Sequence, residues 1–187
     1  MRIISGKNKG MRLYAPEGES VRPTGDKIKE AIFNIIGPIS EEAYVLELFA
    51  GSGGMGIEFL ARGAKHCTFV DASPKSISSV KKNLELCKFK DRAKILLSDY
   101  EKAIINLSKN NEKFDFIFAD PPYALNAGLN IVKYVVEYNI LKPCGTLIVE
   151  SEKIEKVIDN TYTNMVEYKE KTYGRTKISI IKLLEDE

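Results

Sequence analysis

The chain has 187 residues, of which 44% are hydrophobic and 29% are charged, and its formal net charge is +2. This composition is typical of a soluble globular domain and excludes a disordered chain. No apolar run approaches the roughly 20 residues that a membrane span needs, and the first residues lack the apolar stretch of a secretory signal. The single histidine and the three cysteines show no metal-ligand or disulfide spacing. We therefore expect a cytoplasmic protein with no metal and no membrane contact.

Basic residues gather at the start of the chain. Residues 1–12 hold Arg2, Lys7, Lys9 and Arg12 and no acidic residue, whereas the chain ends in three acids. A local basic cluster of this kind can bind the phosphates of a nucleic acid. The alternative is a solvated terminal arm, which composition alone slightly favours.

The first elements are a hairpin and a helix. Segments 2–4 and 11–14 flank a turn at 6–10 and predict a short hairpin. A helix follows, with isoleucines at 28, 32, 35 and 36 on one face, and Gly37-Pro38 is expected to end it.

Strands and helices then alternate through most of the chain. Short apolar runs predict strands, and apolar residues at helical spacing predict helices. The predicted strands cover 44–49, 67–70, 93–97, 114–119 and 145–149, and the predicted helices run from the glycines after residue 50 to about 62, from 74 to 87, over 101–108 and over 129–138. Such alternation implies a parallel sheet with helices on both faces.

The C-terminal part breaks this alternation. Segments 165–172 and 176–184 flank Gly174 and predict two strands that meet in a hairpin. We therefore predict an α/β fold with a mostly parallel seven-stranded sheet that a C-terminal antiparallel hairpin closes. We expect a single domain over 1–187, with an N-terminal β-hairpin arm at 1–24 and the catalytic core at 25–187.

A glycine-rich loop follows the first strand of the core. Gly51, Gly53 and Gly56 fit the pattern G-x-G-x-x-G between a strand and a helix. The first glycine would allow a tight turn, the second a close approach of ligand to backbone, and the third close packing of the helix. A glycine-rich turn without a ligand is the alternative, which the strand–loop–helix context disfavours.

Acidic residues near the ends of three successive strands indicate which ligand this loop binds. Glu47 precedes the loop, Asp71 ends the second strand and Asp99 follows the third. A carboxylate at Glu47 would repel a pyrophosphate, but it would attract the ammonium and sulfonium groups of S-adenosylmethionine. Asp71 could accept hydrogen bonds from ribose hydroxyls, and Asp99 could face an adenine amine. The acids therefore favour S-adenosylmethionine over a dinucleotide.

The fourth strand runs into Asp120-Pro121-Pro122-Tyr123. Two successive prolines stiffen a turn and leave its carbonyls free to accept hydrogen bonds. Asp120 and the Pro121 carbonyl could hold the two N–H bonds of one amino group, and Tyr123 offers a face on which a base could stack. A base amine is a poor nucleophile, and two such acceptors would localise its lone pair and aim it at a methyl group.

Asp120 to Tyr123 resemble the [DN]-P-P-[FYW] motif of Rossmann-like amino-methyltransferases that use S-adenosylmethionine. That motif is shared by enzymes acting on adenine, cytosine, guanine and glutamine, so it does not name the acceptor. The start of the chain, with Arg2-Ile3-Ile4, Gly10 to Leu13 and Arg22 to Glu30, is similar to the RsmD family. The resemblance continues through 49–53 to Tyr173-Gly174 and covers nearly the whole chain.

The resemblance implies methylation of the guanine N2 amine in 16S ribosomal RNA, on assembled or partly assembled small subunits. We also expect the protein to be a monomer. The resemblance assigns target binding and catalysis to Asp120, Pro121, Pro122 and Tyr123. It assigns substrate binding or active-site support to Arg22 and Thr24, in addition to the basic residues of the arm. Lys27 and Lys29 stand where arginine is common in the family, which keeps the charge but loses bidentate phosphate contacts. Cofactor binding falls to Glu47, Phe49, Gly51, Gly53, Gly56, Asp71 and Asp99.

Other functions stay open at this point. An amino-methyltransferase for DNA adenine, another RNA base or a protein glutamine would keep the cofactor site and change the acceptor. An NAD-dependent oxidoreductase would use the glycine loop but not the turn at 120–123, and a non-catalytic RNA-binding module would not use the acidic residues. We interpret Cys67, Cys87 and Cys144 as packing residues.

Overall fold

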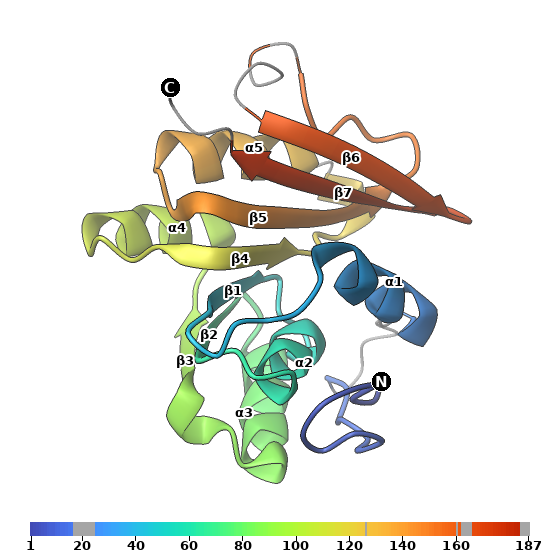
Figure 1. Ribbon diagram of the computed structural model, residues 1–187. Coiled ribbons are helices and arrows are strands. Elements are labelled where there is room, and N and C mark those ends of the chain that lie inside the picture. Colours follow the sequence, from blue (N-terminus) through green and yellow to red (C-terminus); the bar gives the residue numbers. More distant parts are fainter. Residues whose placement is uncertain (17–24, 126, 160, 162–165, 184–187) are drawn as a thin grey trace. The chain divides into compact units, whose positions relative to one another are not determined.

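The computed structural model describes residues 1–16, 25–125, 127–159, 161 and 166–183. The chain divides into two compact units, Met1–Tyr100 and Glu101–Glu187. Strands and helices alternate along the first unit and along the second as far as residue 152 (Figure 1).

The first unit contains three parallel strands, in the order β3-β2-β1. The pairing places Tyr44 opposite His66 and Cys67 opposite Ala93. Its elements are α1 (Asp26–Ile36), β1 (Tyr44–Leu48), α2 (Gly54–Ala61), β2 (His66–Asp71), α3 (Pro74–Cys87), the 3-10 helix η1 (Lys90–Arg92) and β3 (Ala93–Leu97).

The strands of the first unit are buried because helices cover them. Helix α2 packs against β1 and β2, and α3 packs against β2 and β3. Val45, Leu46 and Leu48 are fully buried, which is why β1 reads in the sequence as a continuous apolar run and not as an alternating one. This packing holds the residues that follow β1 and β2 at the carboxyl ends of the two strands.

Local signals set the ends of the helices. The Ser73 side chain accepts the Ser76 N–H at the start of α3, with Pro74 in the first turn. Helix α1 ends at Gly37, whose φ of 78° is a conformation that glycine adopts without strain. Both ends follow the sequence-based prediction.

The second unit contains four strands in the order β4-β5-β7-β6. β4 and β5 are parallel, whereas β7 is antiparallel to both β5 and β6. Helix α5 packs against β5. The elements are α4 (Tyr100–Lys109), which begins at the last residue of the first unit, β4 (Phe114–Ala119), η2 (Tyr123–Leu125), α5 (Gly128–Glu137), β5 (Leu141–Glu152), β6 (Val166–Tyr173) and β7 (Thr176–Leu183).

The predicted α/β class, with mostly parallel strands and a C-terminal antiparallel hairpin, is confirmed, and the described residues form the seven predicted strands. The start of β5 was predicted wrongly. We expected this strand to begin at Gly145, but it begins at Leu141, which pairs with Phe114. Pro143 and Gly145 read as a turn, yet the strand passes through them with a register shift in its pairing with β4.

The N-terminal segment forms the predicted antiparallel pairing, with a bridge between Arg2 and Arg12. Ile3 donates to the Met11 carbonyl and Leu13 to the Met1 carbonyl. We call residues 1–14 the N-terminal hairpin. Ile3 and Leu13 are buried, so the interpretation of this segment as a solvated arm is wrong for its backbone.

Candidate functional site

The glycine loop joins β1 to α2 and is built from left-handed backbone. Gly53 has φ 75° and its N–H donates to the Ala50 carbonyl, which closes the turn before α2. Phe49, directly after β1, also has a positive φ of 56°, which is uncommon for a residue with a large side chain. Its ring lies 5.1 Å from the ring of Tyr100, in a tilted arrangement. Backbone outliers of this kind gather at ligand sites.

Two of the loop glycines differ in what surrounds them. A Cβ at Gly56 would lie 2.5 Å from the Phe69 ring and 2.7 Å from a Glu47 oxygen, so this position needs glycine for close packing, as predicted. A Cβ at Gly51 would meet only the Phe49 carbonyl oxygen, at 4.0 Å. The space over Gly51 is therefore open to a ligand.

Glu47 lies inside the first unit and caps α2. Its two carboxylate oxygens accept the N–H groups of Met55 and Gly56, at 3.1 and 2.9 Å. These N–H groups belong to the first turn of a helix, where the helix itself offers no acceptor. Burial raises the pKa of Glu47 to about 8, against the lowering effect of the two N–H groups and of the Lys29 charge. The sequence predicted a carboxylate near the loop but not this capping role.

Asp71 also supports the loop. One of its oxygens accepts the Gly51 N–H at 2.7 Å, and the other accepts the Ser73 N–H at 2.8 Å. Asp71 therefore ties the glycine loop to the start of α3, on which Ser73 is the cap. The Ser98 N–H donates to the Asp71 carbonyl, and the Ser98 hydroxyl donates to the Asp99 carbonyl. The three strand ends that carry the predicted cofactor residues are thus joined by hydrogen bonds.

Asn83 is a site residue that the sequence analysis missed. Its side chain is fully buried on α3 and donates to the Ser52 carbonyl, within the glycine loop, at 2.8 Å. The available signal was an amide between Val80 and Leu84 on the apolar face of a helix, where a polar residue needs a buried partner.

The turn at 120–123 follows β4, in the second unit. The Leu125 N–H donates to the Pro122 carbonyl at 2.9 Å, so the expectation that both proline carbonyls are free to accept is wrong for Pro122. The Tyr123 hydroxyl lies 2.9 Å from the Thr176 hydroxyl oxygen. Pro121 is buried, whereas Asp120 and Tyr123 are partly exposed. The turn thus presents a carboxylate and an anchored aromatic ring at the end of β4.

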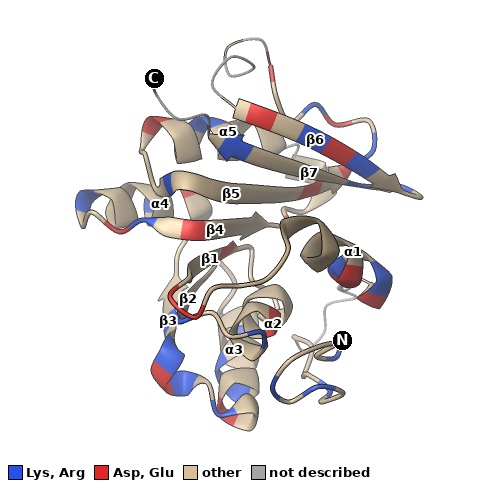
Figure 2. Cartoon of the chain, in the orientation of Figure 1, with Lys and Arg blue, Asp and Glu red and all other residues tan. Residues whose placement is uncertain are grey.

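The predicted basic residues of the N-terminal hairpin lie at its surface. Arg2, Lys7, Lys9 and Arg12 are all exposed, and Figure 2 shows the basic positions spaced along this segment. Arg2 forms an ion pair with Asp26, at 2.8 Å. The remaining predicted substrate-binding residues, Arg22 and Thr24, lie outside the described residues.

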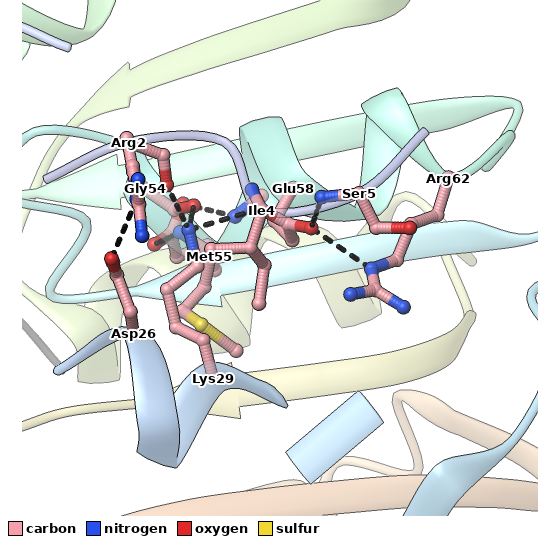
Figure 3. A network of polar contacts seen from close by, with 11 residues as sticks. Arg2, Ile4, Ser5, Asp26, Lys29, Gly54, Met55, Glu58 and Arg62 are labelled. Carbon is pink, nitrogen blue, oxygen red and sulfur yellow. Dashed lines mark hydrogen bonds and ion pairs between the residues drawn. The ribbon is translucent and has the colours of Figure 1, made fainter. Parts of the chain in front are cut away.

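Lys29 does not belong to this basic surface. Its side chain is fully buried and pairs with Glu58 at 3.0 Å (Figure 3), so the charge that the lysine keeps at this family position is not available to phosphates. Helical spacing places Lys29 on the same face as the core residues Ile32 and Phe33. Lys27, two residues earlier, is exposed.

The cysteines were predicted to be packing residues, and the described residues are also informative about a metal site and a membrane-spanning helix. Cys67 and Cys87 are buried, as expected of packing residues, but Cys144 is exposed and that interpretation of it is wrong. Among the described residues no three His, Cys, Asp or Glu side chains gather as a metal site would require. None of the described helices has the length and apolar character to cross a membrane.

Comparisons with known proteins connect the whole chain to one family. Residues 1–182 match the profile of the family described as "Conserved hypothetical protein 95". The Bacillus subtilis protein YlbH is 41% identical, over 97% of this chain and 98% of its own length. The Haemophilus influenzae protein named ribosomal RNA small subunit methyltransferase D is 35% identical, over 93% of this chain and 89% of its own length.

A solved structure supports the same relationship. The crystal structure of HI0767 from Haemophilus influenzae superposes with a TM-score of 0.82 at 30% identity, and the match covers 98% of both chains. The resemblance on which the sequence analysis relied is thereby confirmed. This chain belongs to the family described as "Conserved hypothetical protein 95", the RsmD family of methyltransferases.

Proposed function

We propose that this protein transfers a methyl group from S-adenosylmethionine to the N2 amine of a guanine in small-subunit (16S) ribosomal RNA. The observation that carries the proposal is the turn after β4, where Asp120 stands beside two prolines and Tyr123 is anchored through Thr176. Relatives that are 35% and 29% identical to this chain are named ribosomal RNA small subunit methyltransferase D, which favours RNA over DNA as the substrate.

The cofactor belongs at the glycine loop. The open space over Gly51 and the left-handed backbone at Phe49 and Gly53 suit a ligand that lies against the loop. S-adenosylmethionine supplies an electrophilic methyl group on a positively charged sulfur. Asp71 and Asp99 would hold the ribose and the adenine side, and Glu47 would support the loop by holding the start of α2.

The acceptor belongs at the turn. Asp120 and the Pro121 carbonyl would accept the two N–H bonds of the guanine amine, which keeps its lone pair available for attack. The Tyr123 ring would stack on the base after the base has left its helix, a step that costs a few kcal/mol. The nitrogen gains the methyl group as the bond between methyl and sulfur breaks, which releases S-adenosylhomocysteine, and the amine loses one proton to water or to Asp120. The role of these residues is thus positioning and electrostatic stabilisation, without a covalent intermediate.

RNA binding would come from the exposed basic side chains of the N-terminal hairpin, and Arg22 and Thr24 would contribute to it as the family resemblance implies. Because four basic residues supply modest affinity for phosphates, we propose a substrate of fixed shape, the assembled or partly assembled small subunit. We further propose that the two units act as one domain and that the enzyme is a monomer. The family profile supports the single domain, because it spans both units.

The experiment is transfer of radiolabelled methyl from S-adenosylmethionine to three acceptors in parallel. These are small ribosomal subunits from a strain that lacks this gene, naked ribosomal RNA and duplex DNA. We expect label in the subunits, recovered as N2-methylguanine after nuclease digestion. Label in DNA alone, or as another methylated base, would overturn the proposed acceptor.

A further inference from the structure

One nitrogen atom contacts both the N-terminal hairpin and the glycine loop. The Lys29 ammonium donates to the Arg2 carbonyl at 3.0 Å and to the Gly54 carbonyl at 3.3 Å, and it pairs with Glu58 at 3.0 Å (Figure 3). An ammonium has three N–H donors, and each has an acceptor here. Lys29 therefore holds the hairpin backbone and the first residue of α2 at once.

Glu58 completes this contact from α2. One of its oxygens accepts the Ile4 N–H at 2.9 Å, and the other accepts the Ser5 N–H at 3.0 Å. Arg62, one turn further along α2, forms an ion pair with it at 2.9 Å. Four donors thus converge on one fully buried carboxylate, and two of them belong to the hairpin backbone.

Asn83, on α3, also connects the N-terminal hairpin to the glycine loop. The Asn83 amide oxygen accepts the Tyr14 N–H at 2.7 Å, and its nitrogen donates to the Tyr14 carbonyl at 2.9 Å and to the Ser52 carbonyl at 2.8 Å. Tyr14 ends the hairpin and Ser52 lies in the glycine loop. Two fully buried polar side chains from different helices therefore make the same pair of connections.

The hairpin and α2 also lie in close steric contact. A Cβ at Gly54 would overlap the Met1 sulfur, at 1.7 Å, and a Cβ at Gly6 would overlap the Ala61 carbonyl oxygen, at 2.0 Å. Closely packed atoms transmit displacement instead of absorbing it. A shift of the hairpin backbone would thus move both ends of α2.

We propose that Lys29 and Asn83 are positioning residues that couple substrate RNA on the N-terminal hairpin to cofactor on the glycine loop, so that each ligand tightens the binding of the other. This inference rests on the proposed function, because it takes the basic hairpin as the surface that binds ribosomal RNA. Stability alone does not call for a buried ion pair, since apolar side chains of similar volume stabilise a core as well or better. The coupling is reciprocal by thermodynamic necessity.

The wild-type protein provides the first test. The Kd of S-adenosylhomocysteine is measured by equilibrium dialysis, without and with saturating small ribosomal subunits from a strain that lacks this gene. We expect the subunits to lower this Kd about 5-fold or more, the lower end of typical coupling between sites. The same measurement needs no variant, so it stands even if a buried substitution prevents folding.

Variants then test the assigned residues. Lys29→Met and Asn83→Ala remove the bridges, Lys29→Arg keeps the charge, and Lys27→Met removes a neighbouring exposed charge of α1 as the matched control. We expect the ratio of the two Kd values to fall toward 1 in Lys29→Met and Asn83→Ala, and to stay at the wild-type value in Lys29→Arg and Lys27→Met. A residue with a purely structural role would lower the Tm and leave this ratio unchanged.

The outcomes separate this inference from the proposed function. A wild-type ratio of 1, with subunits that are bound and methylated, overturns the coupling and leaves the function standing. An unchanged ratio in folded Lys29→Met and Asn83→Ala removes the two residues from the coupling. Subunits that are neither bound nor methylated overturn the proposed function, and the coupling with it.

Discussion

The Tyr123 hydroxyl and the Thr176 hydroxyl lie 2.9 Å apart and join the turn after β4 to the first residue of β7. These residues are 53 positions apart in the sequence, and Thr176 is buried. A hydroxyl pair of this kind fixes the direction of the tyrosine ring, on which we propose that the target base stacks.

Thr176→Val should weaken RNA methylation by loosening this ring. A neutral hydrogen bond contributes about 0.5–1.5 kcal/mol, so we expect kcat/KM for small subunits to fall roughly 2- to 12-fold. Tyr123→Phe removes the same bond from the other side, and the double variant should lose little more than either single one. Fully additive losses in this double-mutant cycle would show that the two side chains act independently.

Asp120→Ala should abolish transfer and leave cofactor binding nearly intact. Loss of one group that stabilises a transition state costs roughly 10²- to 10³-fold in kcat, and we expect a loss of at least this size. Single-turnover methylation and S-adenosylhomocysteine titration measure the two quantities. Asp115→Asn is the matched control, because Asp115 lies on β4, the strand that leads into the turn, and pairs with Lys142. Full activity of Asp120→Ala would refute the assigned role.

Glu47 should make stability depend on pH between about 4.5 and 8, the unperturbed and raised values of its pKa. In this window the native state keeps the proton that the unfolded chain releases. The contribution of Glu47 to the free energy of unfolding should therefore be present in full below the window and fall as the pH rises, by at most about 1.4 kcal/mol per pH unit. Urea unfolding at pH 6 and pH 8 measures this slope.

Glu47→Gln removes the titrating group and should flatten that slope. The absolute stability of this variant will differ, because an amide offers one acceptor oxygen to the two N–H groups of α2. The comparison therefore concerns the change from pH 6 to pH 8 and not the values themselves. Equal slopes in the two proteins would contradict the burial-raised pKa of Glu47.

Neutralising Lys7, Lys9 and Arg12 with glutamine should weaken binding of small subunits and reduce its dependence on salt. Each lost phosphate contact lowers the slope of log K against log salt by roughly 0.7 to 0.9, so we expect a reduction of about 2 to 3. Filter binding at several salt concentrations measures it. The control replaces the exposed residues Lys109, Lys113 and Lys156. A slope equal to the wild-type slope would remove the hairpin from the RNA surface.

Gly56→Ala should destabilise the fold, because its Cβ would lie within 2.7 Å of three atoms, from Phe69, Cys67 and Glu47. Overpacking of this kind costs typically about 1–3 kcal/mol, which thermal unfolding detects. Gly25→Ala is the control. A Cβ at Gly25 would meet nothing within 4 Å, and φ there is −60°, so the Tm should change little. A wild-type Tm in Gly56→Ala would mean that α2 can shift away from β2.

The order of elements could be predicted from the sequence because local chemistry decides it. Short apolar runs placed β1, β3 and β4 within a residue of where they lie, and Ser73-Pro74 placed the start of α3. Strand β5 was harder, since it pairs with β4 on both sides of Pro143 and Gly145, at Leu141 and from Thr146 on. Pairing between strands is a long-range interaction that local propensity does not contain.

The sequence by itself determined the class of chemistry. The glycine loop and the turn at 120–123 are contiguous motifs, and their backbone conformation and chemistry depend on residues that are adjacent in the sequence. Only the tertiary structure decided the partners of the polar side chains. In the structure Lys29 is buried and pairs with Glu58. Glu47 caps α2, and Asn83 connects the N-terminal hairpin to the glycine loop. The physical reason is that the burial and the hydrogen-bond partners of a polar side chain depend on residues that are distant in the sequence. Burial and partners in turn determine the charge of that side chain and its role.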